Sequence, residues 1–188
     1  MHYYILSGLG ADEKVFGKLQ FPEPYTHLKW LKNKPTESLS SYAMRMAKRI
    51  EDPENAVLIG LSFGGIVAQE IAAQLAIPQI ILLNTVKHRK EIPWYMRFAG
   101  NVGLHRLFPM LYTRPHMDVA NYFFGINSRQ EKALMYQLMK GMDTAHIEWA
   151  VDKILKWHGV HHGAKVVHIH SRSDKIFPLH FVQADIVI

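Results

Sequence analysis

Cysteine is absent from the 188 residues of the sequence, and so is any long apolar run. Without cysteine the chain has no disulfide, no zinc–thiolate site and no thiol nucleophile, which suits a reducing compartment. No stretch approaches the roughly 20 apolar residues that cross a bilayer, and the first apolar run, at residues 3–6, is too short for a secretory signal. We therefore expect a cytoplasmic protein without stable membrane insertion.

Sequence motifs for cofactors are missing as well. The sequence contains neither a phosphate-binding loop nor a dinucleotide fingerprint, and it shows no pattern typical of nucleic-acid recognition. We therefore expect no cofactor and no nucleic-acid partner. The net charge of +6 is moderate. It is typical of a solvated basic surface, and attraction to anionic substrates or lipid head groups is the alternative.

Strand-like and helix-like segments alternate along the chain. With 48% hydrophobic and 20% charged residues, the composition is that of one folded domain. Strands are expected at residues 2–7, 26–31, 56–60, 79–83, 165–170 and 185–188, and helices at 11–19, 39–50 and 64–76. This alternation predicts an α/β fold with a mostly parallel sheet of about six strands and flanking helices.

Residues 87–150 interrupt this alternation, because they contain no convincing strand and are rich in large apolar side chains at helical spacings. We interpret them as a helical cap inserted into a single domain whose core is formed by residues 1–86 and 151–188. The cap would form an apolar roof over the carboxyl edge of the sheet, the usual ligand site of such folds. A helix resting on a membrane surface is the alternative. Its large side chains are Trp94, Tyr95, Met96, Phe98, Leu107, Phe108, Met110, Leu111, Tyr112, Tyr122, Phe123, Phe124, Met135, Tyr136, Leu138, Met139 and Trp149.

The most specific motif has a serine at its centre. Residues 60–65 have the sequence GLSFGG, directly after the apolar run at 56–59 and directly before an expected helix. This pattern predicts a strand, a sharp turn and a helix, with Ser62 at the apex and glycines where side chains would crowd the turn. A serine in that position is held in a strained conformation with its hydroxyl clear of the sheet. An ordinary turn serine is the alternative.

These features resemble the α/β-hydrolase superfamily in its compact form with a helical cap. Three segments match in the family's chain order, and the resemblance covers essentially the whole chain. Ser62 matches the nucleophile, residues 7–10 (SGLG) match the first oxyanion loop with serine in place of the usual histidine, and Asp174 matches the acid. Plain turn glycines and a capping aspartate are the alternatives. The other place where such folds carry the acid holds Asn84, which favours Asp174.

The resemblance implies a serine hydrolase that cleaves a carboxylic ester, or a thioester or amide, through an acyl-enzyme. The oxyanion would be bound by the backbone N–H groups of Leu9 and Phe63, which would also line the site of a small apolar acyl substrate. Two alternatives stay open: a carbon–carbon bond hydrolase with the same three catalytic residues, and a catalytically inactive binding protein on the same scaffold. Dehalogenation is disfavoured because it requires aspartate where Ser62 stands. The oligomeric state is left open.

The catalytic base is the missing part of the match. The family's histidine follows the last strand, whereas the only histidine after Asp174 is His180, which precedes the last expected strand. His168 and His170 lie in an expected strand and are interpreted as structural, and the cluster at 158–162 as a polar loop and not a metal site. We therefore expect that the natural chain continues beyond Ile188 and that its base lies there.

Overall fold

The computed structural model describes residues 1–17, 19–103, 128–130, 132–133 and 143–188. Within them, six strands form one sheet in the order β2-β1-β3-β4-β5-β6, and every neighbouring pair is parallel. The strands are β1 (His2–Leu6), β2 (Tyr25–His27), β3 (Ala56–Leu61), β4 (Gln79–Leu83), β5 (Lys165–His170) and β6 (Ile186–Val187). The expected parallel α/β sheet is confirmed.

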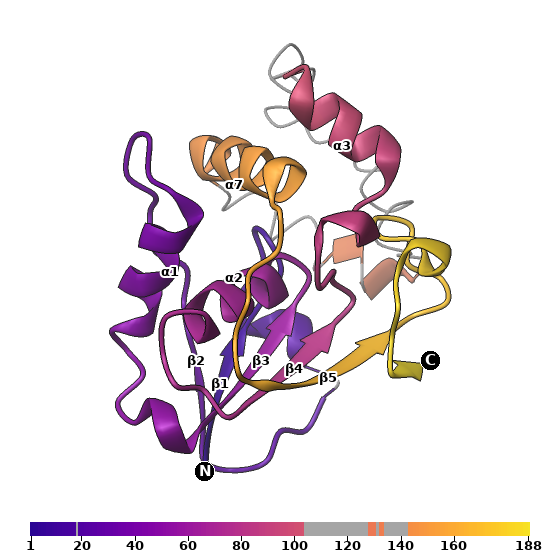
Figure 1. Cartoon of the computed structure of the whole chain (residues 1–188). Helices are drawn as coiled ribbons and strands as arrows, with labels where there is room; N and C mark the ends of the chain where they lie inside the picture. Colours follow the sequence, from indigo (N-terminus) through magenta and orange to yellow (C-terminus); the bar gives the residue numbers. More distant parts are fainter. Residues whose placement is uncertain (18, 104–127, 131, 134–142) are drawn as a thin grey trace.

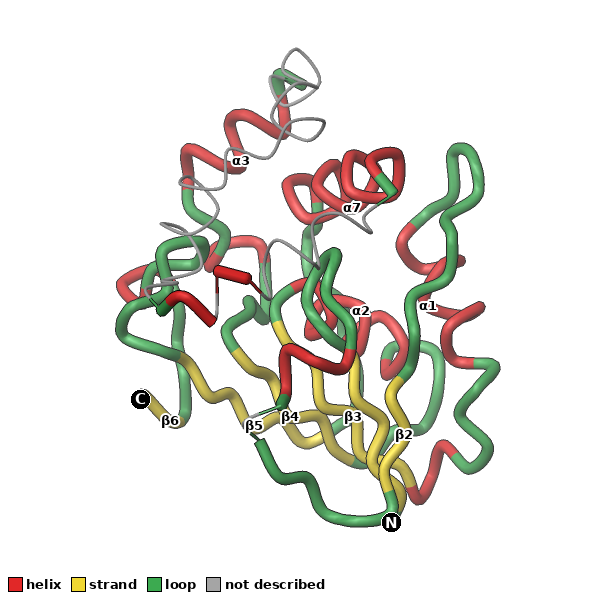
Figure 2. The backbone as a smooth tube through the Cα atoms, turned by 180° about the vertical axis from the view of Figure 1, so that it is seen from behind, coloured by secondary structure: helices red, strands yellow, loops and turns green. Residues whose placement is uncertain are grey.

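Two helices, α1 (Leu39–Ala47) and α2 (Phe63–Ala72), cover one face of this sheet (Figures 1 and 2). The stripe of Leu39, Ala43, Met46 and Ile50 is buried throughout, as its spacing predicts for an amphipathic helix. The helix begins at Ser38, whose hydroxyl accepts a hydrogen bond from the N–H of Ser41 at 3.1 Å. The apolar stripe therefore determines which side of α1 meets the sheet.

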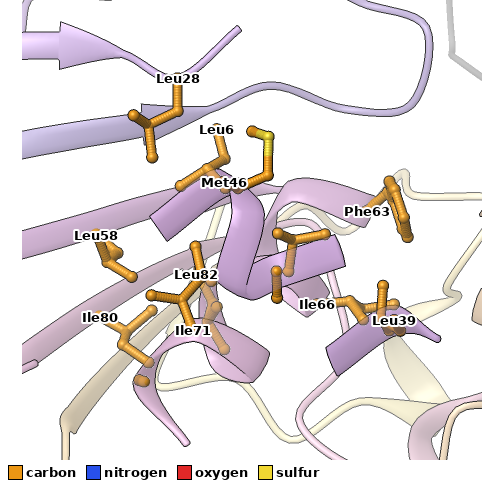
Figure 3. Packing of buried hydrophobic residues seen from close by; sticks show 14 of the residues in the cluster. Leu6, Leu28, Leu39, Met46, Leu58, Phe63, Ile66, Ile71, Ile80 and Leu82 are labelled. Carbon is orange, nitrogen blue, oxygen red and sulfur yellow. The ribbon is translucent and has the colours of Figure 1, made fainter. Parts of the chain in front are cut away.

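The core lies between these helices and the sheet (Figure 3). Residues 56–59 of β3 are all buried, because a central parallel strand is covered on both faces and therefore consists of apolar residues without alternation. Matching positions on neighbouring strands share one face: Leu58 pairs with Ile80, and Gly60 pairs with Leu82. This packing holds the carboxyl ends of β1, β3 and β4 at one edge.

Two described helices, α3 (Trp94–Asn101) and α7 (Thr144–Lys156), lie beyond that carboxyl edge (Figure 1). They pack closely, because a Cβ at Gly100 would lie 2.7 Å from the Cβ of Leu155. None of the described helices is long and apolar enough to cross a membrane. Much of the expected roof lies outside the described residues, namely Leu107, Phe108, Met110, Leu111, Tyr112, Tyr122, Phe123, Phe124, Met135, Tyr136, Leu138 and Met139.

Several elements are shorter than the sequence predicts, α1, α2 and β6 among them, and two of the differences are explained by their neighbours. The helix expected at 11–19 is a single 3-10 turn, Glu13–Phe16, in which only Phe16 is buried, so no apolar stripe sustains further turns. The strand expected at 26–31 runs from Tyr25 to His27, which pairs with Ile5, and the N–H of Leu28 still donates to the Ile5 carbonyl at 2.9 Å before the chain leaves the sheet. Residues 28–31 therefore form a loop. The other short turns are Pro53–Asn55, Arg89–Glu91 and Leu179–Phe181.

Candidate active site

Ser62 lies at the turn between β3 and α2, with φ 52° and ψ −119°. L residues rarely adopt this conformation, and four hydrogen bonds hold it. The N–H of Ser62 donates to the carbonyl of Leu83 at 2.9 Å, and its own carbonyl accepts from the Thr85 hydroxyl at 2.7 Å and from the N–H groups of Gly65 and Ile66 at 2.9 and 3.4 Å. The side chain of Ser62 does not cap the helix and is partly exposed. The strained backbone thus presents a hydroxyl that the helix does not use.

The glycines of the motif permit close backbone contacts around this turn. A Cβ at Gly60 would lie 2.5 Å from the Cα of Gly65, and one at Gly64 would overlap the carbonyl oxygens of Leu6 and Ser7. The start of α2 therefore packs directly on the end of β1 and on the loop that follows it. The GLSFGG pattern is explained by these contacts.

The glycine loop that follows β1 lies beside Ser62. A Cβ placed at Gly8 would be 3.7 Å from the Cβ of Ser62. The loop is closed by the Ser7 hydroxyl, which donates to the carbonyl of Ala11 at 2.6 Å, and by the Ala11 N–H, which donates to the carbonyl of Gly8 at 3.1 Å. Ser7 is buried. At the position where the resemblance implies histidine, Ser7 therefore holds the loop from within.

Several backbone N–H groups near Ser62 have no recorded acceptor in the described part of the chain. They include those of Leu9, in the glycine loop, and of Phe63, the first residue of α2, whose N–H lies beyond the reach of the helix's own carbonyls. The Phe63 side chain is fully buried, and Leu9 is partly buried against the core. What Phe63 can offer at the turn is its backbone N–H and the positive end of α2.

Asp174 follows β5, and its side chain is almost wholly buried. One carboxylate oxygen accepts hydrogen bonds from the N–H groups of Ile176 and Phe177, at 2.8 and 2.9 Å. The second lies 3.7 Å from Nε2 of His170, beyond hydrogen-bond distance. Burial raises the pKa of Asp174 above its ordinary value, although the two N–H groups and His170 oppose the rise. The loop thus fixes one oxygen and leaves the other without a hydrogen bond among the described residues.

Asn84 connects this acid loop to the serine turn. Asn84 follows β4 with φ 44°, and its side-chain oxygen accepts from the N–H of Ser171 at 2.8 Å. Its own N–H donates to the carbonyl of Ile169 at 3.1 Å. Because Ser62 likewise bonds to Leu83 of β4, the carboxyl ends of β3, β4 and β5 are tied together. Asn84 stands where the resemblance implies the other possible position of the acid, and its side-chain amide holds the loop in which Asp174 lies.

The described histidines make no recorded hydrogen bond or ion pair with Ser62. His170 is buried, and its Nε2 lies 2.8 Å from the carbonyl oxygen of Phe177, so Nε2–H is the donor of this hydrogen bond. His168 is buried beside it, and burial lowers its pKa to about 4, so it is neutral at pH 7. His180 is exposed in the turn before β6. The described residues also contain no group of three metal ligands.

An aromatic cluster that the sequence analysis missed lies beside the serine turn: Trp30, Tyr42, Phe63, His146 and Trp149. It joins the loop after β2, helix α1, the start of α2 and helix α7. Burial lowers the pKa of His146. The sequence predicts Trp30 within a strand, whereas in the structure β2 stops at His27 and Trp30 lies in the loop that follows it. No local pattern in the sequence marks its contact with the glycine loop.

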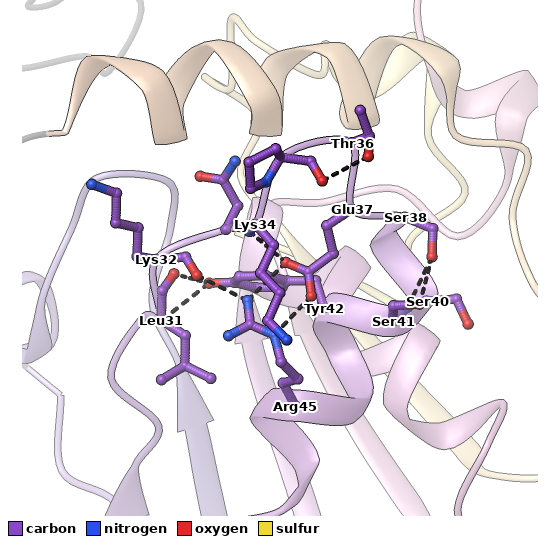
Figure 4. Close-up of polar contacts among 12 residues, drawn as sticks. Leu31, Lys32, Lys34, Thr36, Glu37, Ser38, Ser40, Ser41, Tyr42 and Arg45 are labelled. Carbon is purple, nitrogen blue, oxygen red and sulfur yellow. Dashed lines mark hydrogen bonds and ion pairs between the residues drawn. The ribbon is translucent and has the colours of Figure 1, made fainter.

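A polar anchor holds the loop before α1 next to this cluster (Figure 4). Arg45 donates to both carboxylate oxygens of Glu37 at 2.7 Å, and a further nitrogen–hydrogen group of Arg45 reaches the carbonyl of Lys32 at 2.8 Å. The carbonyl of Glu37 accepts from the indole of Trp149 at 2.9 Å. The hydrogen bonds from Arg45 lower the pKa of Glu37. Helix α7 is thereby tied to the core beside Ser62.

The amino-acid sequence matches no protein-family model, and no curated protein matches it in sequence. Among solved structures, the chain is similar to MGS-M2, an alpha/beta hydrolase enzyme from a Medee basin deep-sea metagenome library, with TM-score 0.61 and 13% identity over 100% of this chain and 79% of the other. It is also similar to the esterase EaEST from Exiguobacterium antarcticum (TM-score 0.66, 13% identity, 96% and 77%) and to the esterase RhEst1 from a Rhodococcus species (TM-score 0.63, 14% identity, 100% and 81%). The chain therefore has the α/β-hydrolase fold.

Proposed function

We propose that this chain is a hydrolase in which Ser62 attacks the carbonyl carbon of a carboxylic ester with an apolar acyl group. The observation that carries the proposal is the turn itself: a strained serine with a hydroxyl not used as a cap, against a glycine loop, between two backbone N–H groups without an acceptor in the described residues. Strain is retained in proteins chiefly where function requires it. The esterases among the similar structures are consistent with this chemistry.

The chemistry would proceed in two balanced steps. A base takes the proton of the Ser62 hydroxyl as its oxygen bonds to the carbonyl carbon, and the N–H groups of Leu9 and Phe63 hold the resulting oxyanion. The oxyanion collapses, the bond to the alkoxy group breaks, and that group leaves with the proton from the base. Water then attacks the acyl-enzyme in the same way and releases the acid and Ser62. Asp174, through its free oxygen, would orient the base and stabilise its charged form.

The test is labelling with a fluorophosphonate, which phosphonylates an activated serine. We expect labelling of the parent and of Ser40→Ala, a control at an exposed position in α1, and none of Ser62→Ala. Because the base stays a prediction, the assay uses the 188-residue chain and, beside it, the full product of its gene. Labelling that persists in Ser62→Ala would remove Ser62 from its role.

A catalytically inactive binding protein is the second candidate, because no recorded contact joins a described histidine to Ser62. The same assay separates the two. If neither form of the chain labels, and neither releases p-nitrophenol from a series of p-nitrophenyl esters of increasing acyl length, the hydrolase proposal fails and the binding protein is favoured. If turnover occurs, the chain-length dependence measures the apolar acyl site directly. A panel of diketone substrates distinguishes carbon–carbon bond hydrolysis.

A further inference from the structure

Trp30 contacts both segments that carry the unpartnered N–H groups. Its indole N–H donates to the carbonyl of Gly8 at 3.2 Å, and its ring stacks on that of Phe63, with centroids 5.4 Å apart and planes 29° from parallel. These two contacts reach the two sides of the serine turn. No other described side chain has a recorded hydrogen bond to the glycine loop and a ring contact with the first residue of α2.

The hydrogen bond to Gly8 determines where the N–H of Leu9 points. The carbonyl of Gly8 and the N–H of Leu9 belong to one planar trans peptide, so they point in opposite directions and rotate together. The indole of Trp30 and the N–H of Ala11 both donate to this carbonyl, at 3.2 and 3.1 Å. Because both donors lie on the carbonyl side, the opposite side of the peptide keeps its N–H free, next to Ser62.

The ring contact acts on the other N–H group. Phe63 is fully buried between Trp30 and Trp149, with an edge-on contact to Trp149 at 6.2 Å. The N–H of Phe63 belongs to the peptide that joins it to Ser62. A ring held on two sides limits the movement of this peptide, and so limits the position of the second N–H group relative to the first.

Trp30 is itself held by a buried tyrosine. The hydroxyl of Tyr42 donates to the carbonyl of Leu31 at 2.8 Å and accepts from the N–H of Leu31 at 3.2 Å, and its ring stacks on Trp30 at 6.3 Å. Tyr42 has no exposed surface, and burial raises its pKa to about 12, so its hydroxyl stays protonated as a donor. The chain after Trp30 is therefore fixed to α1.

We propose that Trp30 is a positioning residue for oxyanion binding: it orients the Gly8–Leu9 peptide by its hydrogen bond and the Ser62–Phe63 peptide by its ring. The inference rests on the proposed acyl transfer at Ser62. The recorded contacts of Trp30 reach Gly8 and Phe63 and do not include Ser62 itself. Trp30 acts through the two peptides, so its effect falls on the transition state, in which the oxyanion exists, and much less on binding of the uncharged ester.

The test compares Trp30→Phe with Trp157→Phe. The control removes a buried indole whose N–H donates to the Glu70 carboxylate at 2.8 Å, away from the glycine loop and from Phe63. Replacing Trp30 by benzothienylalanine, which keeps the ring size and lacks the N–H, isolates the hydrogen bond. Each variant is measured for kcat and KM with a p-nitrophenyl ester, for its rate of fluorophosphonate labelling and for Tm, in whichever form of the chain labels.

We expect Trp30→Phe and the benzothienyl variant to lower kcat and the labelling rate by about tenfold or more, below the roughly 10²- to 10³-fold loss of an entire oxyanion donor, with KM changed by less than about threefold. Trp157→Phe should keep kcat within about twofold even where its Tm falls equally. Equal loss of kcat in both tryptophan variants, or a change confined to KM or Tm, would overturn the inference. Absence of labelling in the parent would instead overturn the proposed function, and this inference with it.

Discussion

The strained turn at Ser62 predicts an unusual order of stability between two substitutions. Glycine adopts positive φ without a steric penalty, so Ser62→Gly should relieve the strain at φ 52°, whereas Ser62→Ala retains it. A residue held in such a region costs about 1–3 kcal/mol, and glycine loses about 0.5–1 kcal/mol to backbone entropy. The difference leaves Ser62→Gly more stable than Ser62→Ala by about 0–2.5 kcal/mol, or up to about 10 °C in Tm for a chain of this size.

The assay is urea unfolding of both variants, with the same pair of substitutions made at Ser40 as a control. Ser40 lies in α1 with ordinary helical geometry, so there glycine should be less stable than alanine, by about 1 kcal/mol. The sign of the difference is therefore opposite at the two positions. If Ser62→Gly proves less stable than Ser62→Ala, the backbone at the turn is relaxed, and the argument from strain is wrong. Both Ser62 variants should lose fluorophosphonate labelling.

Three further predictions concern the acid, the glycines and the polar anchor. Asp174→Asn should lower kcat by about 10⁴-fold. It should not lower the free energy of unfolding at pH 7, because burial raises the pKa of this carboxyl, so its ionisation costs more free energy in the folded chain than in the unfolded chain. A matching fall in stability in urea unfolding would contradict this. Gly60→Ala should destabilise the fold by about 1–3 kcal/mol, since its Cβ would meet backbone atoms at 2.5–2.6 Å. Gly163→Ala, with open space around it, should change stability by less than about 1 kcal/mol. Equal effects of the two substitutions in urea unfolding would refute the close packing at Gly60. Arg45 lowers the pKa of Glu37, so the stability from this pair is present above the ordinary carboxyl pKa of 4.5 and is lost as the pH falls through the lowered pKa. Glu37→Gln should therefore flatten the pH dependence of Tm between about pH 5 and 2. An unchanged slope would show that the pair contributes little.

Local patterns in the sequence were sufficient for the elements whose form depends on neighbouring residues. The buried run of β3 and the glycines around Ser62 act within a few residues, so they could be recognised without knowledge of the fold. The stripe of α1 was predicted for the same reason. The helix expected at 11–19 was wrong in extent, because a propensity for helix is not enough when only Phe16 has a core to pack against.

The sequence alone determined that the chain forms a parallel α/β sheet and that a serine stands at a sharp turn, because both follow from periodicity and from glycine spacing. Only the tertiary structure decided that β2 ends at His27, which leaves Trp30 in a loop that reaches Gly8, and that Asn84 supports the loop of Asp174. Those contacts join residues far apart in the chain, across strands whose order no local pattern specifies. They depend on the order of the strands in the sheet, which decides which loops lie side by side once the core has packed.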